Sequence, residues 1–295
     1  MSPSVKKDVK SRPVPMLERI RIDKKSFRNL RQIIYERSGI SVTEGKEYLL
    51  ENRLADRLKV NHCKSFEEYD YFLRYEPGGE AEIVRMVECI TTNETYFFRE
   101  ESHFTMLREE ILPQLAEQKR FRVNPLIRIW SAASSTGEEP YTISIVVEEA
   151  KRNLSGVRVE ILASDINDAV IRSARRGIYE ENSVRHIPPD IRTRYFSKEG
   201  ARYRLDEKIK SQVRFVHLNL VDKNRLRSAS GMDIIFCKNV LIYFDPVMKK
   251  KVVESLYDSL LPGGYLLIGR SEALHDISRA FRPMKMKNGL VYRKE

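Results

Sequence analysis

A stretch near the middle of the chain, residues 127–141, has the pattern best suited to binding a nucleotide-like ligand. It reads IRIWSAASSTGEEPY: an apolar start, a run of small residues, and then two glutamates and a proline. Small side chains let a ligand lie close to the backbone, and Gly137 can adopt a conformation that other residues avoid. Pro140 suits the first turn of a helix, because its missing N–H would be unpaired there. The stretch therefore predicts a strand, a tight loop and a helix, with the ligand at the carboxyl end of the strand.

The acidic residues of this loop indicate a ligand without phosphate groups. A dinucleotide-binding loop carries the glycines of G-x-G-x-x-G, and its pyrophosphate lies at the helix N-terminus. Here two of the three glycines are absent, and Glu138 and Glu139 occupy the place of the pyrophosphate. Like charges at that distance repel each other. S-adenosylmethionine fits better, because it carries an adenosine, an ammonium and a sulfonium. The alternative is that both glutamates only favour the helix dipole.

Two further stretches contain side chains that could contact such a ligand. Asp165 ends a strand pattern over 157–166, where it could accept hydrogen bonds from ribose hydroxyls or could cap the next helix. Residues 91–101 read TTNETYFFREE, a mixture of polar and aromatic residues. That mixture suits a segment that covers a ligand, or a linker whose aromatic side chains lie between two domains.

The elements that must position these residues follow two patterns. From Asp23 to Glu88 the apolar residues recur at helical spacing, with a capping-box signature at Ser65 and Glu68. We therefore expect a helical domain over 17–90, preceded by a disordered basic tail over 1–16. Beyond residue 91, strand and helix patterns alternate, which predicts a mostly parallel sheet flanked by helices. The strand patterns lie at 127–130, 157–166, 203–205, 213–217, 232–237, 265–269 and 289–292.

Composition excludes several classes of protein. The 295 residues are 41% hydrophobic and 32% charged, as in a soluble globular protein. No apolar run approaches the ~20 residues that span a bilayer, and the N-terminus lacks a signal-peptide core. The 3 cysteines lie far apart and the 5 histidines form no H-x-x-x-H pair. We therefore expect a cytoplasmic protein that holds no metal.

The positive charge of the chain is concentrated in one region. The formal net charge is +11, and residues 172–228 contain 15 Lys and Arg against 7 Asp and Glu. Such a patch attracts a polyanion, either a nucleic acid or an acidic protein surface. The alternative is a solvated face with no partner.

Six motifs, in this order along the chain, resemble the CheR-type chemoreceptor glutamate O-methyltransferase family. They are TNETYFFRE, WSAASSTGEEPY, ASDI, HLNL, FCKNVLIYFD and LLPGGYLLIG. The resemblance covers nearly the whole chain from about Asp23. It implies an α/β fold: a small all-α N-terminal domain, then a Rossmann-like methyltransferase domain over 91–295 with an inserted β-subdomain at about 178–216. The implied cofactor is S-adenosylmethionine, and the implied product S-adenosylhomocysteine.

The resemblance also implies roles for individual residues. Arg99 and Tyr243 would face the transferred methyl group and the substrate carboxylate. The family usually has arginine at the position of Lys238; backbone contacts would survive that change, whereas a bidentate side-chain role would not. The residues implied to contact S-adenosylmethionine are Asn93, Thr95, Arg99, Glu139, Asp165, Asn219, Leu220, Lys238 and Asn239.

The implied partner is the acidic methylation helices of chemoreceptors, with which a basic surface would speed encounter. Some family members also grip a pentapeptide tether at the receptor C-terminus through a longer, glycine-rich β-loop. Here the corresponding loop is short and contains only Gly200, so we expect recognition without the tether. The residues expected to supply charge to the acidic surface are Arg192, Arg194, Arg202 and Arg204.

Alternatives from other classes meet specific objections. A nucleic-acid methyltransferase would normally carry a motif such as N-P-P-[YF], which is absent, so we expect no nucleic-acid partner. A different protein methyltransferase remains an alternative. A non-catalytic receptor-binding module would be expected to have lost Arg99 or Tyr243, and both are present.

Overall fold

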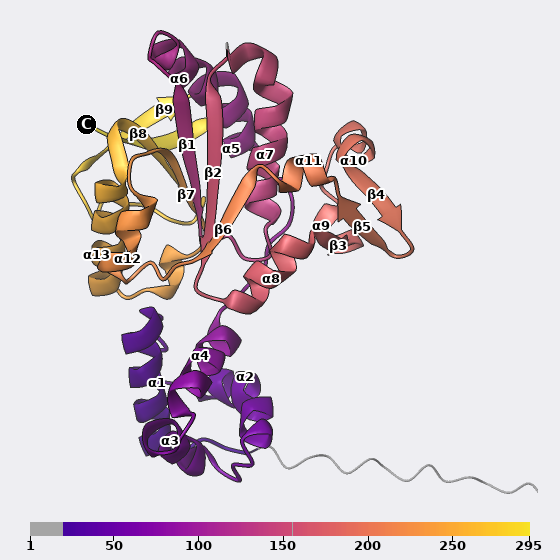
Figure 1. Ribbon diagram of the computed structural model, residues 1–295. Coiled ribbons are helices and arrows are strands. Elements are labelled where there is room, and N and C mark those ends of the chain that lie inside the picture. The colour runs from indigo at the N-terminus through magenta and orange to yellow at the C-terminus, as the bar shows by residue number, and fades with distance from the viewer. Residues whose placement is uncertain (1–19, 155) are drawn as a thin grey trace, which may run out of the picture.

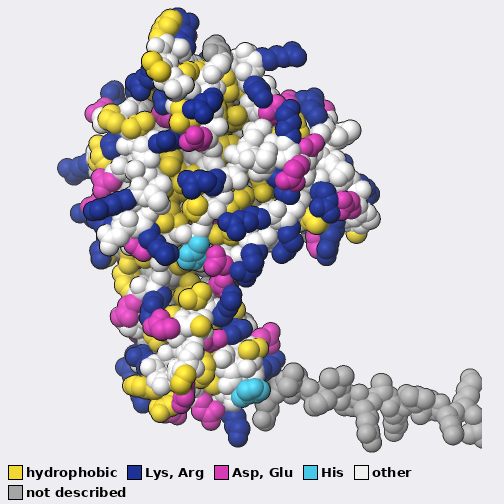
Figure 2. All heavy atoms as spheres, in the orientation of Figure 1, with side chains coloured by type: hydrophobic (Ala, Val, Ile, Leu, Met, Phe, Trp, Pro, Cys, Tyr) yellow, Lys and Arg dark blue, Asp and Glu magenta, His cyan; other side chains and the backbone are white. Residues whose placement is uncertain are grey.

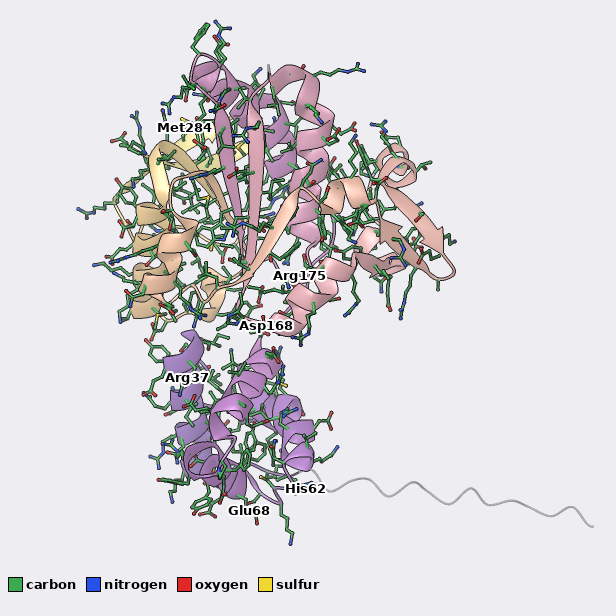
Figure 3. The ribbon with its side chains drawn as sticks, viewed as in Figure 1. Arg37, His62, Glu68, Asp168, Arg175 and Met284 are labelled. Carbon is green, nitrogen blue, oxygen red and sulfur yellow. The ribbon has the colours of Figure 1, made fainter. Side chains whose placement is uncertain are left out.

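The structure is a computed structural model that describes residues 20–154 and 156–295, so the tail expected over 1–16 lies outside the described residues. It has two lobes, a small helical lobe and a larger lobe built on a sheet, which meet where the chain passes residue 91 (Figure 1). Figure 3 shows Arg37 of the helical lobe and Asp168 of the larger lobe near this junction.

The helical lobe forms the all-α domain that the apolar spacing predicts. Its helices are α1 (Lys24–Ser38), α2 (Glu47–Val60), α3 (Phe66–Tyr75) and α4 (Gly79–Ile90). Phe27, Leu30 and Ile34 lie on the buried face of α1 and pack in the core of the lobe. At the start of α3 the Ser65 side chain accepts a hydrogen bond from Glu68 N at 3.2 Å, as the capping signature predicts.

The larger lobe contains a seven-stranded sheet of order β6-β2-β1-β7-β8-β10-β9. The first five of these strands run parallel, and β10 and β9 are antiparallel additions at one edge. Because β1 lies between β2 and β7, the chain order reverses there, and ligands of such sheets bind at the carboxyl ends of strands at this reversal. The strands are β1 (Leu126–Ala132), β2 (Arg158–Asp165), β6 (Val213–His217), β7 (Met232–Cys237), β8 (Leu260–Ile268), β9 (Phe281–Met286) and β10 (Gly289–Lys294).

Helices cover both faces of this sheet, and alternate residues of each strand supply the two layers of core. Ile129 and Phe236 pack on the face covered by α5 to α7, whereas Trp130 and Ile235 pack on the face covered by α13 (Figure 1). The helices of this lobe are α5 (Glu101–Met106), a π-helix η1 (Leu107–Ile111), α6 (Leu112–Lys119), α7 (Glu138–Ala150), η2 (Lys151–Leu154), α8 (Asp168–Arg176), α12 (Lys223–Leu226), η3 (Arg227–Ala229), η4 (Leu241–Tyr243) and α13 (Pro246–Ser259).

A small β-subdomain projects from the side of the larger lobe (Figure 1). Its antiparallel sheet has the order β3-β5-β4. Its elements are β3 (Ile178–Glu180), α9 (Glu181–Val184), α10 (Pro189–Tyr195), β4 (Phe196–Glu199), β5 (Arg202–Leu205) and α11 (Glu207–Lys210). The strand pattern at 213–217 overlaps the end of the insert expected at about 178–216, and as β6 it pairs in parallel with β2 at the edge of the main sheet.

Candidate active site

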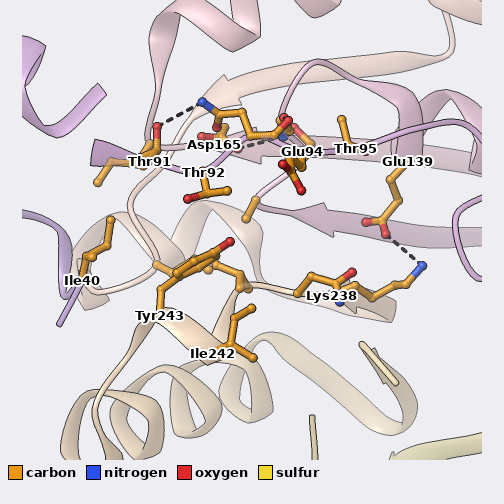
Figure 4. Close-up of a pocket in the computed structure, with 18 of the residues that line it drawn as sticks. Ile40, Thr91, Thr92, Glu94, Thr95, Glu139, Asp165, Lys238, Ile242 and Tyr243 are labelled. Atoms are coloured by element: carbon orange, nitrogen blue, oxygen red, sulfur yellow. Dashed lines mark hydrogen bonds and ion pairs between the residues drawn. The ribbon is translucent and has the colours of Figure 1, made fainter. Parts of the chain in front are cut away.

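A pocket opens at the carboxyl ends of β1, β2, β6 and β7, beside the helical lobe (Figure 4). The structure brings all of the residues implied by the sequence resemblance to this pocket, although they come from loops spread over 150 residues of the chain. They are Asn93, Thr95, Arg99, Glu139, Asp165, Asn219, Leu220, Lys238, Asn239 and Tyr243. Their roles toward a ligand remain predictions.

The loop after β1 has the tight geometry that its small residues predict. Ala133, Ser135 and Gly137 have φ values of 60°, 50° and 97°, in the left-handed region that side chains disfavour. At Gly137 a Cβ atom would lie 2.9 Å from the Ala174 Cβ and 3.0 Å from the Tyr141 ring, so only glycine fits. The loop therefore keeps its backbone close to the pocket, and α7 begins at Glu138 as predicted.

Asp165 lies at the end of β2 and is 6% exposed. Its Oδ2 atom accepts a hydrogen bond from Ser135 N at 2.9 Å, and its Oδ1 atom accepts one from Asn167 N at 3.0 Å. Burial raises the pKa of Asp165, and these backbone N–H groups oppose the rise. The cap of α8 is Asn167, whose side chain accepts from Ala169 N. A carboxylate has about four acceptor sites, so Asp165 can still accept a hydrogen bond from a ligand.

The adjacent glutamates at the start of α7 have different surroundings. Glu139 lines the pocket, where its carboxylate accepts a hydrogen bond from Ser131 Oγ at 2.8 Å. Glu138 is buried outside the pocket lining and accepts from Thr136 Oγ1 at 2.6 Å and from Ser183 Oγ at 3.1 Å. Burial raises the pKa of both carboxyls. Glu139 is therefore the acidic group available to a ligand, and Glu138 connects α7 to the β-subdomain.

Lys238, which stands where the family usually has arginine, is a buried cation at the pocket. Its side chain is 3% exposed, and Nζ donates to the Arg99 carbonyl oxygen at 2.9 Å. Nζ also lies 3.4 Å from Glu100 Oε2. It lies 3.5 Å from Glu139 Oε2, the pair marked in Figure 4. Phe98 and Glu100, on either side of Arg99, have φ values of 58° and 61°. The lysine therefore ties a strained backbone segment to the end of β7.

The two residues implied in catalysis both line the pocket and are partly buried. Arg99 donates from Nη1 to the Glu94 carbonyl oxygen at 2.8 Å, and its guanidinium lies 5.9 Å from the centre of the Tyr96 ring. A guanidinium has five N–H donors, so most of them remain available to a substrate. Within the described residues, no hydrogen bond engages the Tyr243 hydroxyl.

The remaining implied residues connect the pocket loops to one another. Asn93 accepts a hydrogen bond at its carbonyl oxygen from Ser135 Oγ, at 3.0 Å. Asn219 donates from Nδ2 to the Arg37 carbonyl oxygen of α1 at 2.8 Å, and the neighbouring Leu220 is buried. Asn239 has a φ of 57°.

Glu272 and the end of α1 also shape the pocket, and the sequence patterns do not predict either. The Glu272 carboxylate accepts hydrogen bonds from Asn239 N at 2.9 Å, Gly269 N at 2.7 Å and Ile242 N at 3.3 Å. Glu272 lies just beyond the carboxyl end of the β8 strand, and this position is the one sequence signal that could have indicated its role at the pocket. Ile40, directly after α1, lines the pocket from the helical lobe.

The pocket residues fit S-adenosylmethionine. Ser134 lines the pocket, and its Oγ atom is buried without a hydrogen-bond partner among the described residues, so a polar ligand atom that reaches it would satisfy it. Asp165 and Glu139 offer carboxylate oxygens to hydroxyl and ammonium groups. Over residues 20–154 and 156–295, no cluster of three or more His, Cys, Asp or Glu side chains could hold a metal ion, and no helix is long and apolar enough to cross a membrane.

The arginines expected to offer charge are each engaged within the molecule. Arg192 pairs with Glu181 at 3.4 Å, and Arg204 pairs with Glu199 at 2.5 Å. Arg194 and Arg202 likewise pair with Glu149 and Glu180. These ion pairs occupy the four arginines within the molecule, and their role toward an acidic receptor surface stays a prediction. Among the described residues, the cations of this region that make no ion pair include Arg172, Arg176 and Arg214.

Comparisons with known proteins match both lobes. The family described as "CheR methyltransferase, all-alpha domain" matches residues 25–91, and "CheR methyltransferase, SAM binding domain" matches residues 93–290. The chain is 38% identical over 269 residues to chemotaxis protein methyltransferase 2 of Vibrio cholerae, covering 91% of this chain and 92% of that one. It is 38% identical over 257 residues to the chemotaxis protein methyltransferase of Borreliella burgdorferi, covering 86% and 90%. It is 34% identical over 272 residues to chemotaxis protein methyltransferase 1 of Pseudomonas aeruginosa, covering 90% and 97%.

Proposed function

The chain belongs to the CheR methyltransferase family, and on this premise we propose that it transfers a methyl group from S-adenosylmethionine to glutamate side chains of chemoreceptors. The product would be a glutamate methyl ester. The observation that carries the proposal is that every residue implied to bind S-adenosylmethionine or the substrate lines one pocket.

We also propose domain boundaries at 17–90 and 91–295. A cytoplasmic location is consistent with the free thiols of Cys63, Cys89 and Cys237.

The chemistry requires positioning more than acid–base catalysis. A glutamate side chain has an unperturbed pKa of about 4.3, so it is already an anionic nucleophile at neutral pH. S-adenosylmethionine supplies a methyl group on a positively charged sulfur, which is already activated. What remains for the protein is to hold the two reactants in line, and well-oriented reactants gain roughly 7–11 kcal/mol in this way. The absence of a catalytic triad from the sequence motifs agrees with this requirement.

Arg99 and Tyr243 are the residues that we assign to the substrate. The free N–H donors of Arg99 suit paired hydrogen bonds to the incoming glutamate carboxylate. Its backbone is held by Lys238, which donates to the Arg99 carbonyl oxygen. The Tyr243 hydroxyl is available to orient the carboxylate or the methyl group.

The acidic residues of the pocket are assigned to the cofactor. Asp165 would accept hydrogen bonds from the ribose hydroxyls, since its carboxylate is fixed by two backbone N–H groups. Glu139 would accept from the ammonium group, and Ser134 Oγ offers a further polar contact. Asn93, Thr95, Asn219, Leu220, Lys238 and Asn239 complete the set that we propose for the cofactor.

For the receptor, we propose that the acidic methylation helices are attracted by α8 and β6. Arg172 and Arg176 are one helical turn apart on α8, and Arg214 lies on the edge strand next to that helix. In Figure 2, Lys and Arg side chains are spread over this face of the larger lobe, among hydrophobic and other side chains, down to the hollow between the lobes. Charge attraction of this kind raises the rate of encounter and weakens with salt.

The reaction is tested by incubating the protein with methyl-tritiated S-adenosylmethionine and either receptor-containing membranes or nucleic acid. Label in the receptor that is released as volatile methanol by mild alkali supports a glutamate methyl ester. Alkali-stable label in the receptor would overturn the ester, and label in nucleic acid would favour the alternative class. Mass spectrometry of receptor peptides then identifies the modified side chains.

Tether-independent recognition is tested separately. The isolated receptor C-terminal pentapeptide is titrated against the protein by calorimetry, and receptor methylation is measured at increasing salt. No peptide binding together with salt-sensitive methylation supports the proposal. Binding of the peptide at micromolar concentration would contradict it.

A further inference from the structure

The end of α1 is joined by backbone contacts to the loop that carries Tyr243. Ile40 forms an antiparallel bridge with Phe244, and Ser41 N donates to the Tyr243 carbonyl oxygen at 2.9 Å. Figure 4 shows Ile40 beside Tyr243 at one end of the pocket. Two residues 200 positions apart in sequence are therefore neighbours in the pocket wall.

Gly39 allows this close approach between the lobes. It ends α1 with a φ of 76°, and a Cβ atom there would lie 2.7 Å from Val221 Cγ1 and 2.9 Å from Met248 Cγ. The same Cβ would lie 3.2 Å from the ring of Phe244, the residue that Ile40 bridges. Any larger residue at this position forces the side chains of Val221, Met248 and Phe244, or the two lobes, to move apart.

The loop itself has little internal support. Tyr243 ends η4, a single 3₁₀ turn over Leu241–Tyr243, and such short turns are weakly held by their own hydrogen bonds. On the side of the larger lobe, Glu272 accepts from Asn239 N and Ile242 N. On the other side, the contact from Ser41 reaches Tyr243 itself. The loop is thus fixed between a carboxylate of one lobe and the backbone of the other.

We propose that residues 39–41 of the helical lobe are positioning residues for Tyr243, so that this lobe completes the active site of the larger lobe. The proposal rests on the function proposed above, in which Tyr243 orients the reacting groups. Misplacing such a group by about 1 Å can lower the rate by about 100-fold. Asp165 and Glu139 lie on other loops, whereas Asn239 and Leu220 lie close to this segment, so displacement should slow methyl transfer and also weaken cofactor binding to a smaller extent.

The test compares Gly39→Ala with Gly45→Ala. Both glycines belong to the helical lobe and have positive φ values, 76° and 82°, so both variants carry similar backbone strain. They differ in surroundings, since a Cβ at Gly45 has no atom within 4 Å. We expect Gly39→Ala to lower kcat by about tenfold or more at saturating substrates, a larger factor than its increase in the KM for S-adenosylmethionine. For Gly45→Ala we expect kcat within about twofold, because its site touches no reacting group.

Amide hydrogen exchange provides a readout that does not depend on activity. In Gly39→Ala the Ser41 amide should exchange about tenfold faster than in Gly45→Ala, because it loses its acceptor, the Tyr243 carbonyl oxygen. The peptide covering residues 239–245 should also exchange faster, because the loop is no longer held from the helical lobe. If Gly39→Ala does not fold, Ser41→Pro takes its place in both measurements, because proline lacks the donor N–H. Equal exchange in the two variants would overturn the proposal, as would faster exchange with unchanged kcat. If the wild type methylates no receptor, the proposed function fails, and the exchange data still decide whether the helical lobe holds this loop.

Discussion

Replacing Lys238 with methionine tests the buried charge cluster beneath the pocket. The lysine ammonium lies 3.4 Å from Glu100 Oε2 and 3.5 Å from Glu139 Oε2, and its side chain is 3% exposed. Methionine keeps most of the volume and removes the charge, which leaves both carboxylates without their cation. Removing one partner from a buried ion pair destabilises a protein by about 3–5 kcal/mol, so we expect a loss of that size in the free energy of unfolding.

The pH dependence of this loss has a definite sign. Burial tends to raise the pKa of Glu100, and the charge of Lys238 is the largest effect that opposes it, so the pKa is lowered overall. Without Lys238 the effect of burial dominates, and the pKa values of Glu100 and Glu139 should both rise. A carboxyl whose pKa is raised in the folded state binds protons more readily there. Acidification therefore stabilises the folded Lys238→Met variant relative to wild type. The deficit of Lys238→Met should therefore be largest near neutral pH and shrink toward about pH 5.

Urea unfolding of wild type and variant at about pH 8 and at about pH 5 measures both effects. Lys250→Met is the control, because Lys250 is exposed on α13 and its loss should change stability by less than about 0.5 kcal/mol. Lys238→Arg keeps the charge and should recover most of the stability. A Lys238→Met variant as stable as Lys250→Met at the higher pH would refute the reasoning, and a deficit that grows on acidification would refute the assigned pKa changes.

Three further predictions concern binding, catalysis and acid stability. Asp165→Ala should weaken S-adenosylmethionine binding by about 1.5–3 kcal/mol in calorimetry, with Asp168→Ala as control; an unchanged affinity would remove Asp165 from the site. Arg99→Ala should nearly abolish methyl transfer at an unchanged melting temperature, whereas Arg108→Ala should not; near-normal turnover of Arg99→Ala would contradict its role. Burial lowers the pKa of His103 from 6.5 to about 4, so the unfolded chain binds a proton first on acidification. Wild type should therefore lose stability between these pH values, by roughly 3 kcal/mol, and His103→Gln should lose less in urea unfolding.

The parts of the fold that are specified locally could be predicted from the sequence. Gly137 has the positive φ expected of it, and α7 begins at the predicted Glu138, because small residues, glycine and proline act on their own stretch of backbone. Ser65 caps α3 for the same reason. The resemblance to a known family then supplied the order of the motifs, and the structure places their polar residues around one pocket.

Pairings between distant segments could not be predicted in the same way. The strand pattern at 213–217 is correct, but its alternation does not say which strand it joins, and it joins β2 of the main sheet. Similarly, a run of arginines shows its own charge and not that of its neighbours in space. Arg192 and Arg204 are paired with Glu181 and Glu199, so these two arginines are not free cations, although the net charge counted over the region is unchanged.

The junction between the lobes shows most clearly why such contacts leave no trace in a single sequence. Ser41 reaches Tyr243 through its backbone N–H, a group that every residue except proline possesses, so its residue type carries no information about the contact. Asn219 likewise donates to the carbonyl oxygen of Arg37, for which the arginine side chain is irrelevant. The residue type that does carry information is Gly39, because the neighbouring Val221 leaves no room for a Cβ atom. A glycine at the end of a helix, however, is also the ordinary helix C-cap, so its second role becomes visible only when the two lobes are seen together.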